Sequence, residues 1–172
     1  AAPAHDVLED WGVLEWIEHL YQQANDSVEE FARSLGEAPA VRRTYRTWIS
    51  ELLERDPSGA DAFFDAVVRD EQLPQHFRDD TIIAFLRSAH AAALLTRHAS
   101  RLVENDKRLL GRVVHLLRVG CVTVPAWIPS PTASSILSYP EGEAWPTVLS
   151  VVRDHLSLFD SRDRQLLLAF VE

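Results

Sequence analysis

The chain has 172 residues, with 17 Lys and Arg against 26 Asp and Glu, which gives a formal net charge of −9. This charge argues against a protein whose main work is to grip nucleic-acid phosphates or an anionic membrane. A content of 47% hydrophobic and 25% charged residues is typical of a globular chain, a single cysteine excludes an internal disulfide, and no stretch approaches the roughly 18 uncharged apolar residues of a membrane span.

The beginning of the chain shows helical spacing of its apolar residues. Between Leu8 and Tyr21 such residues recur every three or four positions, which predicts one amphipathic helix. Ser27 and Glu30 then form a capping-box pattern for a short helix that ends near Gly36. Pro39 suits the first turn of a third helix, because its missing N–H would have no partner there.

Two more helices are predicted before the middle of the chain. The third helix is expected to stop before the turn sequence Asp56-Pro57-Ser58-Gly59, and a fourth is expected from Ala60 to Asp70. Pro74 interrupts the pattern. Asp79 or Asp80 is expected to cap the helix that follows.

The second half of the chain reads as helical except for one segment. Residues 89–104 favour a helix, and the next helix is expected to open at Asn105-Asp106 and close at Gly120. Five of the nine prolines then fall in or just past residues 121–145, and two more helices are expected at 144–159 and 161–172. No hairpin signal joins alternating runs, so we expect an all-α fold, either an irregular helical bundle or a short solenoid of helical hairpins.

This pattern predicts three parts: a helical domain at 1–120, a proline-rich connection at 121–144, and a terminal helical hairpin at 145–172. The connection is our candidate hinge. The chain contains no methionine, and an apolar helical pattern still runs at Phe170-Val171-Glu172, so we expect it to be part of a longer parent protein in which the terminal hairpin continues. An alternative is an exported helical binding protein, because Ala-Ala-Pro-Ala at the start could remain after export processing.

One cluster of basic and aromatic residues could serve nucleic-acid binding. Arg42, Arg43 and Arg46 lie beside Tyr45 and Trp48, and such a set can hold phosphates and stack bases. The alternative is a solvated helix face whose aromatic residues enter the core. The negative charge of the chain favours the second interpretation, with the arginines paired to acidic residues of the same helix, Glu51 and Glu54.

A second candidate for chemistry is the pair Arg108 and His115. An Arg followed several residues later by His resembles the catalytic motif of HEPN-type ribonucleases, which are also all-α. That resemblance implies that the His acts as acid or base and the Arg stabilises phosphate charge. The structural alternative, which we favour, places both residues on the polar rim of an amphipathic helix.

The remaining polar residues predict no reactive centre. The seven histidines are scattered, and His90 and His98 are eight residues apart, out of register for one chelating face, so no metal site is predicted. Cys121 lacks a neighbouring base and is expected to be buried in the core. The acidic residues near the start are expected to form an exposed helix face; they are Glu9, Asp10, Glu15 and Glu18.

The stretch from His5 to Trp11 resembles a motif of STAND-family signalling NTPases, the superfamily with NACHT and NB-ARC members. It reads His-Asp-Val-Leu-Glu-Asp-Trp, and in that family the stretch lies in the winged-helix subdomain, where its His senses bound ADP. The resemblance implies that His5 and Asp6 sense nucleotide in an intact parent. Ala4 stands where plant members have Met, and a phosphate loop is absent, so this chain by itself is not expected to bind ATP or ADP.

The resemblance implies a bacterial, cytoplasmic helical arm that follows the nucleotide-binding core. Such an arm is a non-catalytic scaffold that contacts other proteins or other domains of its parent and relays the nucleotide state. Neither a cofactor nor a catalytic residue is expected in this chain, and neither a membrane nor a nucleic acid is the expected partner. The alternative, from a different class, is a stand-alone HEPN-like ribonuclease that uses Arg108 and His115.

Overall fold

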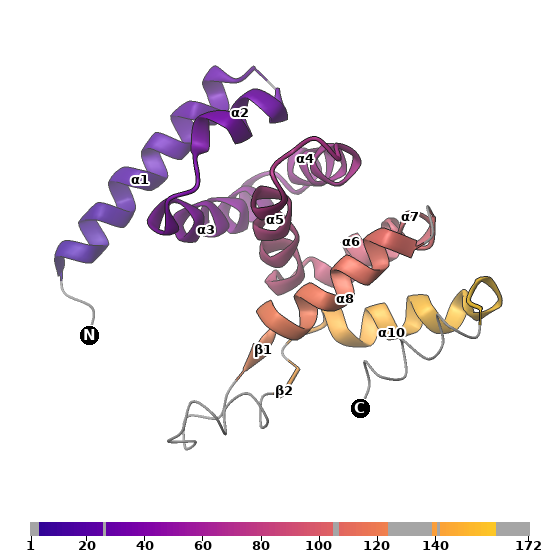
Figure 1. The fold of residues 1–172 in the computed structure, drawn as a ribbon. Helices are drawn as coiled ribbons and strands as arrows, with labels where there is room; N and C mark the ends of the chain where they lie inside the picture. The colour runs from indigo at the N-terminus through magenta and orange to yellow at the C-terminus, as the bar shows by residue number, and fades with distance from the viewer. Residues whose placement is uncertain (1–3, 26, 105–106, 124–138, 141, 161–172) are drawn as a thin grey trace. The chain divides into compact units, whose positions relative to one another are not determined.

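The structure is a computed structural model that describes residues 4–25, 27–104, 107–123, 139–140 and 142–160; for residues 4–10 and 139–140 it describes the backbone alone. The described chain is helical almost throughout, so the predicted all-α class is confirmed (Figure 1). The chain divides into two compact units, Ala1–Ser88 and Ala89–Glu172, which we term the N-terminal unit and the C-terminal unit. No helix among the described residues combines the length and apolar character that crossing a bilayer requires.

The helices of the N-terminal unit follow several of the predicted capping signals. They are α1 (Ala4–Gln23), α2 (Val28–Leu35), α3 (Pro39–Arg55), α4 (Pro57–Arg69) and α5 (Gln75–Arg87). The Glu30 amide donates a hydrogen bond to the Ser27 hydroxyl at 3.3 Å, which caps α2, and Gly36 ends that helix with a φ of 73°. Pro39 is the first residue of α3. These three predictions are confirmed.

Helix α4 begins earlier than predicted. The Gly59 amide donates a hydrogen bond to the Asp56 carboxylate at 3.0 Å, so Asp56 caps the helix and Pro57 occupies its first position. A proline at this position removes a donor that no carbonyl of the helix would accept. The sequence read as a turn is therefore the first turn of a helix, and the predicted start at Ala60 is wrong.

Helix α5 also begins earlier than predicted. It starts at Gln75, directly after Pro74, which stands at its N-cap position. Asp80 consequently lies inside the helix and is buried, as is Thr81 beside it. The prediction of a cap at Asp79 or Asp80 is wrong, because Asp80 has a partner on another helix rather than on its own backbone.

Helix α3 occupies the centre of the N-terminal unit, and α1, α4 and α5 pack against it (Figure 1). A cluster of aromatic rings fills the space between these helices. Phe31, from α2, is fully buried, and its ring centroid lies 5.3–6.1 Å from those of five others. The five are Tyr21, Tyr45, Trp48, Phe63 and Phe77. Offset and edge-to-face pairs at these distances stabilise a core beyond the effect of buried area alone.

The C-terminal unit is built from shorter helices and two very short strands. They are α6 (Ala91–Arg97), α7 (Ala99–Leu102), α8 (Arg108–Gly120), β1 (Val122–Thr123), β2 (Tyr139–Pro140), α10 (Ala144–Asp154) and the 3₁₀ helix η2 (Leu156–Leu158). The strands pair antiparallel. Helix α10 packs against α6 and α8, and the Trp145 indole donates a hydrogen bond to the Cys121 carbonyl at 3.1 Å.

The boundary between the two units falls between Ser88 and Ala89, inside the region that the sequence predicted as one helical domain at 1–120. Of the predicted proline-rich connection at 121–144, residues 124–138 and 141 lie outside the described residues, and so does the hinge hypothesis for that segment. The first helix of the predicted terminal hairpin at 145–172 corresponds to α10. The second, at 161–172, lies outside the described residues.

Candidate functional site

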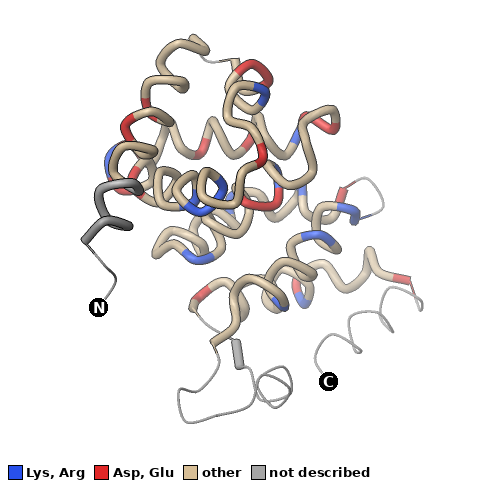
Figure 2. Tube along the Cα trace, turned by 60° about the vertical axis from the view of Figure 1, so that its left-hand side comes forward, with Lys and Arg blue, Asp and Glu red and all other residues tan. Residues whose placement is uncertain are grey.

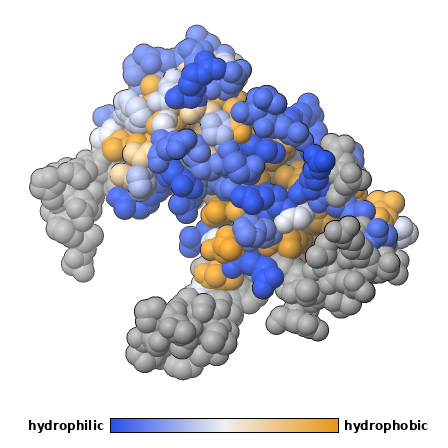
Figure 3. Space-filling view, in the orientation of Figure 1, coloured by the Kyte–Doolittle hydropathy of each residue, from blue (hydrophilic) through white to orange (hydrophobic). Residues whose placement is uncertain are grey.

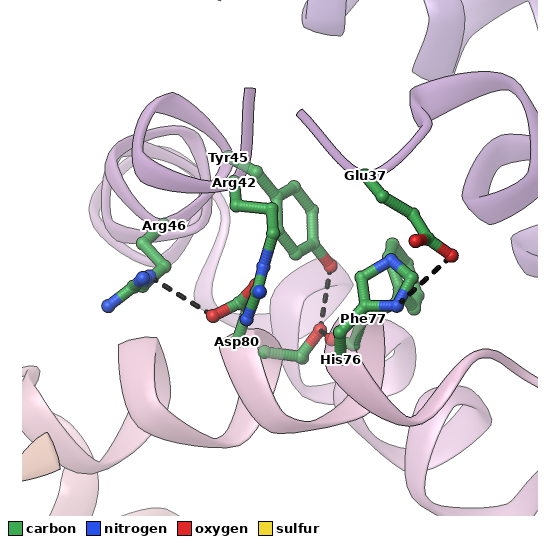
Figure 4. A network of polar contacts seen from close by, with 8 residues as sticks. Glu37, Arg42, Tyr45, Arg46, His76, Phe77 and Asp80 are labelled. Atoms are coloured by element: carbon green, nitrogen blue, oxygen red, sulfur yellow. Dashed lines mark hydrogen bonds and ion pairs between the residues drawn. The ribbon is translucent and has the colours of Figure 1, made fainter. Parts of the chain in front are cut away.

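A buried carboxylate joins two helices at the centre of the N-terminal unit (Figure 4). Asp80 of α5 is 1% exposed and receives a hydrogen bond from Arg42 Nε of α3, with 2.6 Å between Nε and Oδ2. Arg46 Nε lies 3.2 Å from the other carboxylate oxygen, in an ion pair that lacks hydrogen-bond geometry. Both guanidinium groups remain partly exposed, so Asp80 is covered by two arginines that also face solvent.

A second set of polar contacts runs beside this ion pair. Thr81 donates its hydroxyl proton to the Phe77 carbonyl at 2.8 Å, so the Tyr45 hydroxyl is the donor in the 2.7 Å contact between Tyr45 and Thr81. Burial raises the pKa of Tyr45 well above its ordinary value, against the hydrogen bond with Thr81, which lowers it. Tyr45 is therefore a neutral donor that ties α3 to α5.

At the edge of the same region, Figure 4 shows the His76 ring facing the Glu37 carboxylate. Nδ1 of His76 lies 3.7 Å from Oε1 of Glu37, and the Glu37 side chain is largely exposed. An exposed contact of this length contributes little to the free energy of folding. The groups around Asp80 are thus chiefly used to connect α3 with α5.

The sequence placed Arg42 and Arg46 on a helix face paired with Glu51 and Glu54, and that pairing is wrong. Their partner is Asp80, 38 residues beyond Arg42 in the chain. The accompanying expectation that Tyr45 and Trp48 enter the core is confirmed, because each is 1% exposed. The rings are therefore not available to stack on bases.

Glu18 of α1 forms a second polar connection, this time to α3. It accepts hydrogen bonds from the Trp48 indole at 2.8 Å and from Arg55 at 3.0 Å, and also from Gln22 at 3.1 Å. Burial raises the pKa of Glu18, but these hydrogen bonds outweigh that effect and place it below its ordinary value. The expectation that Glu18 belongs to a simple exposed face is wrong.

Sequence reasoning missed Asp80 and Glu18 as connecting residues. A signal was present in each case, since both acids lie three or four positions from apolar residues of their own helix: Glu18 from Leu14 and Tyr21, and Asp80 from Phe77 and Ala84. A charged residue inside such a stripe is almost never fully buried unless it has a partner. The identity of that partner depends on tertiary contacts.

The outer face of α1 carries the exposed large apolar side chains that the structure describes in the N-terminal unit. Trp11 is 74% exposed and Trp16 is 40% exposed. Successive residues of a helix are rotated by about 100° around its axis. Trp11 and Trp16 therefore lie at the two edges of one arc of the helix surface, and exposed residues lie between them. We define the outer face of α1 by five residues: Trp11, Gly12, Glu15, Trp16 and His19. A shallow, open groove runs along part of this face, and it is lined by Gly12, Glu15, Trp16, Glu18, His19 and Gln22.

His5 and Asp6, the predicted nucleotide-sensing pair, lie in the first two turns of α1. Their side chains are outside the described part of the structure, and the sensing role stays a prediction. The last residue of the same motif, Trp11, is exposed on the outer face of α1.

Arg108 and His115 are both exposed and lie on the same side of α8. They are seven residues apart, which corresponds to a separation of roughly 10 Å along the helix axis. The opposite side of α8 buries four core residues, namely Leu110, Val113, Leu116 and Leu117. This is the geometry of a polar rim, and the ribonuclease role stays a prediction.

Cys121 is fully buried, as predicted. Among the described residues, no group of three His, Cys, Asp or Glu side chains is arranged to hold a metal ion. No protein-family model matches the chain, and no curated protein sequence matches it either.

Charge distinguishes the two units. The N-terminal unit contains 18 Asp and Glu against 8 Arg, a formal net charge of −10, whereas the C-terminal unit contains 8 acidic and 9 basic residues, a net charge of +1. Figure 2 shows acidic positions in red at many points along the helices of the N-terminal unit. The acidity of the chain is thus concentrated in the unit that carries the outer face of α1.

Proposed function

We propose that this chain is a non-catalytic helical scaffold, a regulatory arm that binds other proteins or relays a conformational change between them. The proposal rests on one observation: charged residues at the centre of the N-terminal unit pair with residues of other helices. Asp80 is covered by Arg42 and Arg46, and Glu18 is bonded to Trp48 and Arg55, so these groups hold α1, α3 and α5 together. A unit joined in this way moves as one body, which a relay requires.

The proposal includes a place for the chain in a larger STAND-like signalling ATPase. What supports this part is the resemblance of residues 5–11 to the nucleotide-sensing motif of that superfamily, together with the all-α arm that follows it. In such a parent, ATP or ADP would bind upstream of this chain. Reading the genomic sequence that precedes Ala1 tests it: a phosphate-binding loop is expected there, and a secretory signal would contradict it.

The relay itself is tested by hydrogen exchange on the purified chain and on Asp80→Asn. If α1, α3 and α5 form one cooperative unit, their slowest amides exchange at similar rates, and the substitution accelerates exchange in all three helices together. Acceleration confined to α5 would contradict the proposal, because the helices would then open independently. Glu51→Gln is the matched control, since Glu51 is an exposed acid on α3.

The rival function, an RNA-cleaving enzyme, is tested separately. Labelled RNA is incubated with the chain and with His115→Ala. The scaffold proposal expects equal, background cleavage by both proteins. If the unsubstituted chain cleaves RNA and His115→Ala abolishes that cleavage, the scaffold proposal is defeated and the ribonuclease is supported.

A further inference from the structure

The outer face of α1 has an apolar and acidic character that the folding of the chain does not account for. Within the described N-terminal unit the other large apolar side chains are buried or half-buried, whereas Trp11 and Trp16 remain exposed. Figure 3 shows hydrophobic atoms in orange among the hydrophilic atoms on the visible face of this unit. Two exposed tryptophans on one helix are a typical feature of protein-binding surfaces, where Trp is enriched among the residues that dominate affinity.

Gly12 supports the same interpretation. It lies inside a long helix, where glycine is less favourable than alanine by about 0.8–1.0 kcal/mol. A Cβ placed on Gly12 would meet nothing within 4 Å, so the fold itself does not need a glycine here. A glycine between two exposed tryptophans allows another backbone to approach α1 closely.

The charge of this surface identifies the kind of partner. Glu15 is exposed at the middle of the outer face of α1 and forms no hydrogen bond or ion pair with any described residue. The unit around it has a net charge of −10, which repels a second copy of the chain, nucleic acid and anionic lipid. Lys and Arg side chains, by contrast, can pair with Glu15 and lie against the indole faces.

We propose that the outer face of α1 binds a basic amphipathic helix of a partner protein, an inference that rests on the proposed scaffold function. The partner helix lies over Gly12 and Glu15 with its apolar stripe against Trp11 and Trp16. Its Lys and Arg residues face Glu15 and the acidic surface of the unit. The shallow groove along α1 is an open surface of the kind that a helix, rather than a small molecule, can cover.

The test uses the whole chain and a synthetic peptide of about 18 residues, five helical turns, in which Leu forms one helical stripe and Lys the remainder. Binding is measured by fluorescence anisotropy of the labelled peptide at physiological salt. Two control peptides are a scrambled version without the stripe and a version with Glu in place of Lys. We expect micromolar binding of the first peptide and at least tenfold weaker binding of both controls.

Variants of the chain locate the binding surface. Gly12→Gln and the double variant Trp11→Ala/Trp16→Ala are expected to weaken binding at least tenfold, since all three residues belong to the outer face. Gly111→Gln is the matched control, because Gly111 is also exposed within a helix and also has open space around it. Circular dichroism confirms that each variant is folded.

Several outcomes would overturn the inference: no binding of the basic peptide, equal binding of the scrambled peptide, or binding that the Gly12 and Trp variants leave unchanged. If the chain self-associates and Trp11→Ala abolishes this self-association, the inference is also overturned, because the occupant of the surface is then a second copy of the chain. The scaffold proposal would survive these outcomes, because hydrogen exchange and the RNA assay test it independently.

Discussion

The two units are both helical, yet different kinds of side chain hold them together. The described core of the N-terminal unit centres on packed aromatic rings, with ion pairs and hydrogen bonds joining α1, α3 and α5. The described core of the C-terminal unit is largely aliphatic, as Leu94, Val113, Leu117 and Val148 illustrate. Ring geometry and hydrogen bonds are directional, whereas aliphatic contacts are not. The N-terminal unit is therefore the better candidate for a body that must keep one arrangement.

The largest test of this comparison is a pair of core truncations. Phe31→Ala is expected to lower the free energy of unfolding by about 3–5 kcal/mol and Leu117→Ala by about 2–5 kcal/mol. Because Phe31 contacts rings from α1, α3, α4 and α5, its loss should accelerate hydrogen exchange in all four helices. An effect of Phe31→Ala limited to α2 would show that the aromatic cluster does not unite the unit.

The next effect concerns the buried ion pair. Asp80→Asn removes the negative charge that accepts a hydrogen bond from Arg42 and forms an ion pair with Arg46, and it is expected to destabilise the N-terminal unit by about 1–3 kcal/mol. The arginines are 37% and 40% exposed and regain water, which keeps the cost below that of a fully buried pair. Glu51→Gln, at an exposed position of α3, should change the free energy of unfolding by no more than about 0.5 kcal/mol. Urea unfolding monitored by hydrogen exchange measures both.

A smaller effect is the dependence of the free energy of unfolding on pH. The pKa of Glu18 is lower in the folded chain than its ordinary value, so the unfolded chain takes up this proton first as the pH falls. The stability from Glu18 is present above about pH 4.5 and is lost as the pH falls through the folded pKa. Glu18→Gln should therefore reduce the acid dependence of the urea midpoint. A Glu18→Gln variant that keeps the full acid dependence would contradict this prediction.

The smallest effect compares one exposed helix glycine from each unit. Gly12→Ala and Gly111→Ala are each expected to raise the free energy of unfolding by about 0.8–1.0 kcal/mol, because neither added Cβ meets another atom within 4 Å. Thermal and urea unfolding of the two variants measure this. A destabilising Gly12→Ala would mean that the glycine serves the fold itself, which would weaken the case for a partner at this position.

The sequence by itself determined the all-α class and several helix ends. Ser27, Gly36 and Pro39 act through contacts with residues within about one helical turn, so their roles can be read from neighbouring positions. Of the two helix starts that were predicted too late, α4 begins with a proline and α5 begins directly after one. A proline interrupts a helix in its interior but is tolerated at its first turn, and sequence spacing alone does not distinguish these positions.

The tertiary structure alone decided which charged residues of different helices pair. Arg42 and Asp80 are 38 residues apart, and Glu18 is 37 residues from Arg55, so no local pattern joins them. Such pairs form only after apolar faces have brought α1, α3 and α5 together, because burial then removes the water that would otherwise solvate each charge. The outer face of α1 was decided in the same way: it consists of the residues that the packing of this helix left exposed.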